Sequence, residues 1–288
     1  MIEQYFSVKQ KDSQTYNFSF ICITEDKKKD IVLIKELQKE IIRAYRSPRL
    51  LQRKRGHLDR NQLIDYINKK VIPQELTNFD KAVRYGDFGE VFASLLINYL
   101  ENKISFNKLQ WKYNKDKSVF GTDIVAFDNI DAPTEIGYYE IKTRENSLKK
   151  EEIDKIKVGD KKQSIKDYIT VIAYKSLEKD MNSDTESILD YMSRLYENAN
   201  DLDKSDLFSE LADGVRTINK IYAIYIITDS KIYNKKYSIL LSSLNNIPIT
   251  INPLSVNFVF IDNLKTLMKD TWKKIAINAA DFIEADEL

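Results

Sequence analysis

The sequence has few residues of the types that build zinc and redox sites. Its 288 residues include one cysteine, Cys22, and one histidine, His57. A single thiol excludes an intramolecular disulfide and a cysteine-rich zinc site, and a single histidine excludes any site built on two histidines. The amino-terminal stretch also lacks the basic and then apolar layout of a signal peptide. We therefore expect a protein of the reducing cytoplasm.

Glycine is scarce as well, with seven residues in the chain. Neither a Walker loop nor a dinucleotide-binding fingerprint is present. Asp87-Phe88-Gly89 spells one kinase motif, but the other kinase motifs are missing, so we interpret the match as chance. No apolar run approaches the roughly 18 residues that span a bilayer, so we expect no membrane contact. Any polar chemistry must rest on carboxylates, lysines and arginines.

Hydrophobic periodicity predicts an α/β fold with a mixed central sheet flanked by helices. The most apolar run, residues 221–228, predicts a central strand covered on both faces. A seam near Pro73 to Asp80 separates an amino-terminal α/β extension, residues 1–80, from residues 81–288. Strands are expected at residues 16–24, 106–113, 119–127, 136–143, 221–228 and 256–261. Helices are expected at residues 30–45, 59–71, 87–100, 183–198, 205–218 and 263–280. Residues 149–163 are expected to form a solvated helix or loop, and residues 168–174 a strand or a buried helix.

The strand expected at residues 136–143 carries an acid and a base, Glu140 and Lys142. Side chains two positions apart on a strand share a face, roughly 6 to 7 Å from each other. If this strand pairs antiparallel with the preceding one, Asp123 lies beside Glu140, and two such carboxylates repel unless a cation lies between them. Mg²⁺ takes oxygen ligands and is commonly held by one or two carboxylates plus a substrate phosphate. The pattern therefore predicts a Mg²⁺ site, at which Mn²⁺ can substitute.

An acid and a lysine with one residue between them are weak evidence alone, because a chain of this composition contains about five such pairs by chance. The context is more specific, since the pair interrupts an apolar strand and follows both a strand with Asp123 and a helix with Glu90 near its expected start. The alternative is that Glu140 and Lys142 form the wet face of an edge strand. For Glu90, the alternative is an acid stabilised by the helix dipole.

With these motifs the sequence resembles the PD-(D/E)XK nuclease superfamily, whose core runs helix, three strands, helix, strand. The resemblance places the acid of the first helix at Glu90, the Asp of the second strand at Asp123, and the (D/E)XK pair at Glu140 and Lys142. Thr122 stands where the superfamily has proline. More narrowly, the sequence is similar to HamA, the family of nuclease subunits in Hachiman anti-phage defence, in the segments RYGDFGEVFASLL, FGTDIVAF and YYEIKTR. This implies a restriction-endonuclease-like core and a DNA nuclease that works with a helicase, HamB.

The residues suggest a role for each group. Asp123, Glu140 and the main-chain carbonyl of Ile141 would hold Mg²⁺, which polarises the scissile phosphate and lowers the pKa of a bound water. Lys142 would orient or deprotonate that water, or neutralise charge on the phosphorus oxygens. Glu90 would bind a second ion or its water shell.

Binding of DNA needs cations, and six of the ten arginines lie within eighteen consecutive residues. Arginine suits bidentate phosphate contacts, so this segment is a predicted DNA or partner patch, with a solvated basic face as the alternative. Arg84 and Arg144 flank the expected site elements and would touch phosphates or pair with nearby acids. The patch residues are Arg43, Arg46, Arg49, Arg53, Lys54, Arg55 and Arg60.

The formal net charge is only +1, with 45 basic and 44 acidic residues. A nuclease that finds DNA unaided gains from a strongly basic surface, so we expect a modest grip on DNA and a helicase partner that delivers or restrains the chain. The hypothesis is a Mg²⁺-dependent, sequence-nonspecific DNA nuclease of phage defence. The alternatives are a sequence-specific restriction endonuclease and a non-catalytic interaction subunit that keeps the nuclease core.

Overall fold

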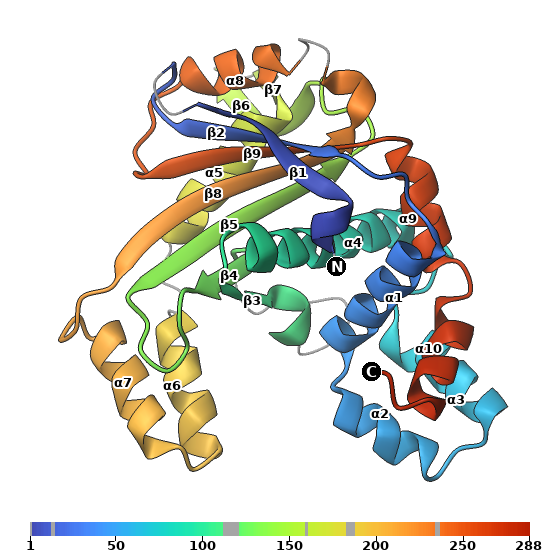
Figure 1. Cartoon of the computed structure of the whole chain (residues 1–288). Helices are drawn as coiled ribbons and strands as arrows, with labels where there is room; N and C mark the ends of the chain where they lie inside the picture. The colour runs from blue at the N-terminus through green and yellow to red at the C-terminus, as the bar shows by residue number, and fades with distance from the viewer. Residues whose placement is uncertain (1, 13–14, 112–120, 159–160, 183–187, 234–236) are drawn as a thin grey trace.

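A computed structural model describes residues 2–12, 15–111, 121–158, 161–182, 188–233 and 237–288, without side-chain detail for residues 110–111, 153–158 and 161–163. Its centre is a seven-stranded mixed sheet in the order β1-β2-β9-β8-β5-β4-β3, and β6 pairs with β7 in a separate hairpin (Figure 1). The strands are β1 (Phe6–Asp12), β2 (Ser19–Glu25), β3 (Ile104–Asn107), β4 (Ile124–Phe127), β5 (Glu135–Arg144), β6 (Glu151–Val158), β7 (Lys161–Asp167), β8 (Asn219–Asp229) and β9 (Leu254–Ile261).

Helices cover both faces of this sheet, which confirms the predicted α/β class. One face packs against α1, α4, α9 and α10, and the opposite face against α5 and α8. A third apolar cluster joins α6 and α7 to β4 and β5. The helices are α1 (Ile31–Tyr45), α2 (Pro48–Arg55), α3 (Arg60–Tyr66), α4 (Asn78–Leu100), α5 (Ile169–Met181), α6 (Ile188–Asn198), α7 (Leu202–Ala212), α8 (Ser238–Asn245), α9 (Leu264–Trp272) and α10 (Ile275–Glu284).

The centre of the sheet follows the sequence pattern closely. Strand β8 runs parallel to β5 on one side and to β9 on the other, and its apolar run is buried, as predicted for a central strand. Strands β3, β4 and β5 form an antiparallel meander. Asp59 and Gln62 form a capping box at the start of α3.

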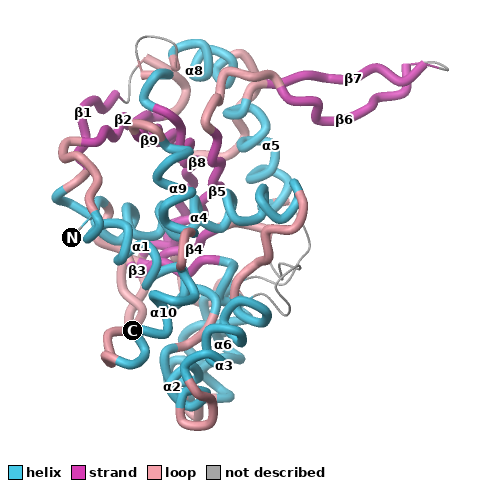
Figure 2. Tube along the Cα trace, turned by 90° about the vertical axis from the view of Figure 1, so that its right-hand side faces the viewer, coloured by secondary structure: helices cyan, strands magenta, loops and turns pink. Residues whose placement is uncertain are grey.

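Several element predictions are wrong. Residues 149–163 are expected as a solvated helix or loop, but residues 151–158 form β6 and residues 161–163 begin β7, while residues 159–160 lie outside the described ranges. These two strands pair as a hairpin that projects away from the body of the protein (Figure 2). The strand expected at residues 106–113 ends at Asn107, where a 3-10 turn (Lys108–Trp111) begins, and residues 112–113 lie outside the described ranges. Residues 119–120 of the next predicted strand also lie outside them, and β4 begins only at Ile124.

The helix expected at residues 263–280 is two helices, because Lys273 is extended and Lys274 adopts a left-handed φ of 55°. Helix α4 begins nine residues before the predicted start at residue 87. Residues 183–187 of another predicted helix lie outside the described part, and α7 ends at Ala212 rather than at residue 218. The open alternative at residues 168–174 resolves to helix, as part of α5. Strand β1 and helices α2 and α8 were not predicted.

The amino-terminal segment shares its sheet and core with the rest of the chain. Strand β2 runs parallel to β9 and pairs with it from Ser19 to Thr24, while α1 packs against α4, α9 and α10. The predicted division at residue 80 stays a prediction. In the part of the chain that the structure describes, no helix is both long and apolar enough to cross a membrane.

Candidate active site

The acids and the lysine of the predicted motif meet at one end of the β4–β5 hairpin. Asp123 directly precedes β4, and the pairing of Ile124 with Tyr139 puts Asp123 opposite Glu140. The Ile141 backbone N–H donates a 2.8 Å hydrogen bond to the Asp123 carboxylate, which fixes that side chain against β5. Tyr139 packs in the core on the α4 side, whereas the Lys142 ammonium contacts the Glu140 carboxylate, so the predicted alternation is observed.

Burial of these acids excludes the edge-strand alternative. Strand β5 lies between β4 and β8, and only 2% of Glu140 and 4% of Asp123 are exposed to solvent. Glu140 Oε2 is buried without a hydrogen-bond partner among the described residues. A buried carboxylate oxygen without a partner carries a substantial desolvation cost, which the contact of Glu140 with Lys142 offsets in part.

The environment of Glu140 changes its acidity. Burial, and after it the nearby Asp123 charge, raise the pKa of Glu140 to about 7 against the opposing effect of Lys142. For Lys142, burial alone lowers the pKa, but the Glu140 and Asp123 carboxylates outweigh burial and the pKa is raised. Lys142 is thus a charged ammonium beside two carboxylates.

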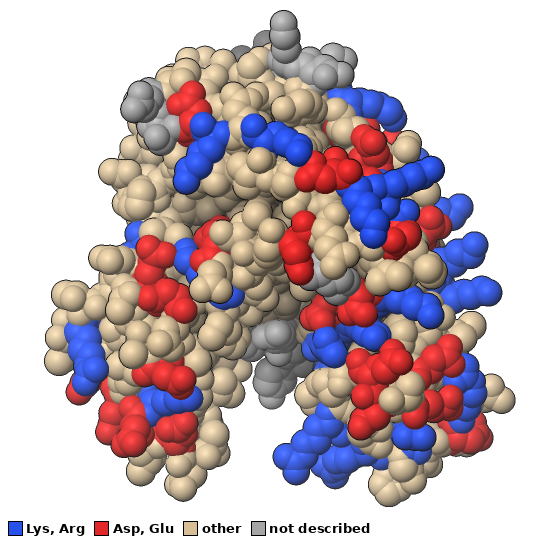
Figure 3. All heavy atoms as spheres, in the orientation of Figure 1, with Lys and Arg blue, Asp and Glu red and all other residues tan. Residues whose placement is uncertain are grey.

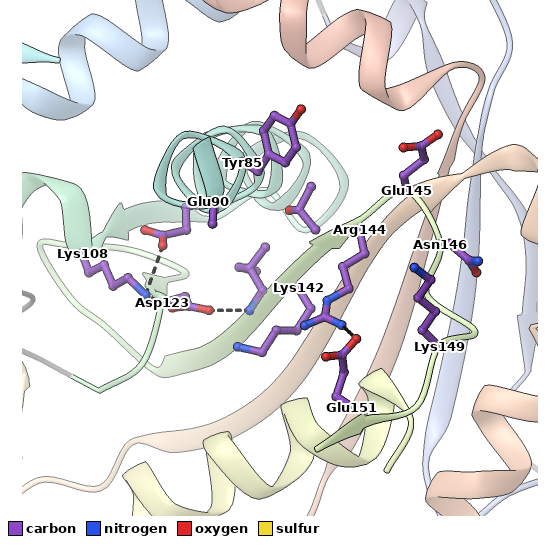
Figure 4. Close-up of a pocket in the computed structure, with 14 residues that line it drawn as sticks. Tyr85, Glu90, Lys108, Asp123, Lys142, Arg144, Glu145, Asn146, Lys149 and Glu151 are labelled. Atoms are coloured by element: carbon purple, nitrogen blue, oxygen red, sulfur yellow. Dashed lines mark hydrogen bonds and ion pairs between the residues drawn. The ribbon is translucent and has the colours of Figure 1, made fainter. Parts of the chain in front are cut away.

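A second lysine that the sequence pattern did not reveal joins this group. The Lys108 ammonium contacts Asp123 and lies 3.1 Å from Glu90 Oε1, so it bridges acids from α4 and from the start of β4 (Figure 4). Burial lowers its pKa, but the Asp123 and Glu90 charges outweigh burial and raise it. Lys108 escaped prediction because it opens a 3-10 turn where the sequence indicated a continuous strand.

Glu90 reaches this group from the middle of α4. The helix dipole acts on charges in the first turn of a helix. Helix α4 starts at Asn78, so Glu90 lies well past that turn, and the dipole alternative is wrong. Gly89 lets the helix approach β5 closely, because a Cβ atom at this position would lie 1.7 Å from Thr143 Oγ1. The close approach of α4 to β5 holds Glu90 beside the end of the hairpin.

A surface pocket of about 660 Å³ opens over this group (Figure 4). Asp123, Lys142, Lys108 and Glu90 line it, whereas Glu140, which contacts Lys142, is not among its lining residues. Other parts of the wall come from α4, from the end of β5 and from the segment leading into β6, and include Tyr85, Thr143, Arg144, Glu145, Asn146, Lys149 and Glu151.

The donor set fits a hard divalent cation only in part. Over the described ranges, no three acidic, histidine or cysteine side chains lie close enough together to hold a metal ion alone. Asp123 and Glu140 nevertheless supply two buried carboxylates that repel each other, and one Glu140 oxygen has no described hydrogen-bond partner. Two carboxylates with a backbone carbonyl and a substrate phosphate are a normal Mg²⁺ environment. The carbonyl of Ile141 stays a predicted ligand.

The predicted DNA-binding arginines occupy three different places. Arg144 lines the pocket and forms an ion pair with Glu151. Arg84 lies outside it, 2.6 Å from Glu75 and hydrogen bonded to the Pro73 carbonyl. Both arginines thus pair with nearby acids, which was the alternative to phosphate contact. The structure does not bring the segment from Arg43 to Arg60 into the pocket, and Arg60 at its end pairs with Asp281 and Glu284 of α10.

Comparison with known proteins places this arrangement in a family. A search of curated proteins found no relative of the chain. A family model described as HamA matches residues 2–283, which include every element from β1 to α9 and nearly all of α10. The match confirms the narrower resemblance seen in the sequence motifs. The chain belongs to the HamA family, whose members take part in the multi-component Hachiman systems of anti-phage defence.

Proposed function

We propose that this chain is a metal-dependent DNA nuclease that hydrolyses phosphodiester bonds without sequence specificity. One observation carries the proposal: Asp123, Glu140 and Lys142 converge from two adjacent strands at the end of a hairpin, beneath an open pocket. The PD-(D/E)XK resemblance supports the same chemistry. The cofactor would be Mg²⁺, with Mn²⁺ as a substitute.

Each residue of the site has a distinct task in this proposal. Asp123 and Glu140, with the Ile141 carbonyl, would hold the cation, which when bound polarises the phosphate and lowers the pKa of a bound water. The charged state of Lys142 suits it to orient that water and to neutralise charge on the phosphorus oxygens, rather than to act as the base. Lys108 would keep Glu90 and Asp123 in place and add positive charge to the pocket.

A helicase partner forms the second part of the proposal. Acidic and basic side chains are interspersed over the face seen in Figure 3, in keeping with the formal net charge of +1. Such a surface attracts duplex DNA weakly, so a helicase would bring the strand to the pocket in the cytoplasm.

Substitution in the site tests the nuclease proposal. The wild type and the variants Glu140→Gln and Lys142→Ala are each purified with the helicase partner and incubated with linear and circular DNA, with Mg²⁺ or with chelator. We expect each substitution to slow cleavage at least about a hundredfold, a loss typical of removed electrostatic catalysis. Lys220→Ala is the control, since Lys220 is exposed near the start of β8, at the opposite end of that strand from the site.

Product lengths and cell survival decide between the alternatives. Discrete fragments would show a restriction endonuclease, whereas progressive loss of DNA agrees with nonspecific cleavage. If Glu140→Gln and Lys142→Ala both leave phage defence intact, the chain is a non-catalytic subunit and the nuclease proposal fails.

A further inference from the structure

A second pocket, of about 310 Å³, adjoins the candidate active site and is strongly basic. Helices α4 and α9 supply its walls, with Tyr85 and Trp272 as aromatic residues and Glu75 as its only acid among the described residues. We call it the basic pocket. Five cationic side chains line it: Lys81, Arg84, Lys265, Lys269 and Lys273.

Most of this positive charge has no ion-pair partner among the described residues. Glu75 pairs with Arg84, and Lys265 lies 3.9 Å from Glu145, at the limit of an ion pair. Lys81, Lys269 and Lys273 are exposed and form no ion pair within the described part of the chain. Three unpaired lysines around one recess create a local positive potential in a molecule that is almost neutral overall.

The geometry of α9 directs these charges to one side. Lys265 and Lys269 are four residues apart and therefore neighbours on one helix face, and Lys273 is the extended residue that directly follows the helix. Leu264, Leu267 and Met268 on the other face are buried in the core. Lys265 and Lys269 are thus held on a fixed helix face, and the Lys273 backbone N–H is bonded to the Lys269 carbonyl at the end of that helix.

The aromatic wall is also fixed. The Arg84 guanidinium lies 5.1 Å from the centre of the Trp272 ring. It also donates two hydrogen bonds, of 3.1 and 2.9 Å, to the Pro73 carbonyl. Since Trp272 is 7% exposed and Arg84 is committed to these contacts, the two side chains form a rigid floor. The partly exposed Tyr85 adds a second aromatic ring beside the lysines.

The basic pocket adjoins the candidate active site. Tyr85 lines both pockets, and Glu145, which lies 3.9 Å from Lys265, lines the active-site pocket (Figure 4). A volume of 310 Å³ is at the lower end for small-ligand pockets, so one nucleotide is a suitable occupant. Cationic grooves with aromatic side chains are the usual means of binding single-stranded nucleic acid.

We propose that the basic pocket holds one nucleotide of a single DNA strand where that strand passes beyond the candidate active site. Lys81, Lys269 and Lys273 contact its phosphates, and Tyr85 and Trp272 border its base. This inference rests on the proposed nuclease function, because it takes the scissile strand to occupy the neighbouring pocket. An acidic peptide of a partner protein is the rival ligand, but it would not explain why the pocket adjoins the active site.

The test measures binding of a short fluorescein-labelled oligothymidine by fluorescence anisotropy, in chelator so that no cleavage occurs, over a range of salt concentrations. The proteins are the full-length wild type, the double variant Lys269→Ala/Lys273→Ala and the control Lys220→Ala. We expect the double variant to bind about tenfold more weakly at the lowest salt. The slope of log affinity against log salt should fall by about 1.4, or roughly 0.7 for each lost phosphate contact.

The proposal is overturned if the wild type does not bind the oligonucleotide at low salt, or if the double variant keeps the affinity and slope of the wild type. An equal loss in Lys220→Ala would also overturn it, since the effect would then be general electrostatics. Tighter, lysine-dependent binding of a polyglutamate peptide would assign the pocket to a protein partner instead. All three lysines are exposed, so unchanged melting temperatures should accompany these variants.

A cleavage assay with Mg²⁺ of the same proteins and of Glu140→Gln, each together with the helicase partner, separates the two proposals. If the wild type does not cleave DNA but the lysine pair is needed for binding, the nuclease function fails and the nucleotide site stands. If the wild type cleaves, Glu140→Gln does not, and the lysine pair is without effect on binding, the nucleotide site alone fails.

Discussion

Lys108 holds two acids together at the candidate active site, and its removal should expose their repulsion. In Lys108→Met the Glu90 and Asp123 carboxylates lose the ammonium that bridges them. We expect the free energy of unfolding in chelator to fall by about 3 kcal/mol, the size typical of breaking a buried ion pair. Because a divalent cation at Asp123 replaces part of the lost charge, Mg²⁺ should stabilise this variant more than the wild type, as measured by urea unfolding.

Lys103 provides the matched control for this experiment. It is 8% exposed and pairs with Glu101 at 3.0 Å and Glu135 at 2.8 Å, outside the active-site pocket. Lys103→Met should lose a similar amount of stability, but Mg²⁺ should not restore it. Equal effects of Mg²⁺ on both variants would show that Lys108 does not border a cation site.

Glu140 should make stability depend on pH. Its pKa is raised from 4.5 to about 7 in the folded protein by burial and by Asp123. Between these values Glu140 binds more protons in the folded state than in the unfolded state, so its contribution to stability is fully present below pH 4.5 and is lost as the pH rises through 7. Urea unfolding in chelator should show this decrease in the wild type and a smaller decrease in Glu140→Gln. Identical pH profiles would contradict the raised pKa.

The sequence predicted the site residues that obey strand periodicity. Asp123, Glu140 and Lys142 lie on elements whose alternation fixes the direction of each side chain, and the structure brings them together. Lys108 and the basic pocket were missed for a physical reason. Lys108 depends on a 3-10 turn, and the basic pocket depends on the contact of two helices that are distant in sequence. The hydrophobic periodicity of one segment encodes neither feature.

At the scale of elements, the contact of α4 with β5 sets the position of Glu90. A Cβ atom at Gly89 would lie 1.7 Å from Thr143 Oγ1 and 3.0 Å from Thr143 Cβ, so Gly89→Ala must displace the Thr143 side chain and strain the contact of the helix with the strand. We expect a loss of about 1 to 2 kcal/mol in stability, after allowing for the better helix propensity of alanine. Cleavage should fall as well, because Glu90 moves with the helix.

Gly86 is the matched control on the same helix. A Cβ atom there meets nothing within 4 Å, so Gly86→Ala should be neutral or should stabilise the protein by up to about 1 kcal/mol. Thermal unfolding and cleavage rates of the two variants give the comparison. If Gly89→Ala is as stable and active as Gly86→Ala, close packing at Gly89 does not position the site.

Element boundaries show where local pattern was insufficient. The stripe of Leu264, Leu267 and Trp272 continues into Ile275 with helical spacing, and this spacing concealed the break at Lys273 and Lys274 between α9 and α10. The β6–β7 hairpin was missed because its charged sequence lacks the apolar alternation of a half-buried strand. Central strands such as β8 were predicted well, since both of their faces are apolar and buried.

For the whole molecule, the amino-terminal strands and helices complete the sheet and the core, so the chain should fold as one unit. A fragment of residues 81–288 would lose β2 and thereby free the edge of β9, which pairs with β2 from Ser255 to Phe260. It would also lose α1, whose Leu33, Leu37 and Ile41 are buried in the largest core cluster. An unpaired apolar edge and an uncovered core favour aggregation over folding.

We therefore expect the fragment of residues 81–288 to aggregate, or to unfold without a cooperative transition in urea. The control is a chain in which a short glycine-serine linker replaces the projecting hairpin from β6 to β7, whose two strands pair only with each other. This chain should keep a cooperative transition close to that of the wild type, because it leaves the seven-stranded sheet intact. A soluble fragment with a sharp urea transition would show instead that residue 80 is a true domain boundary, and that the first two strands are an added layer rather than part of the folding unit.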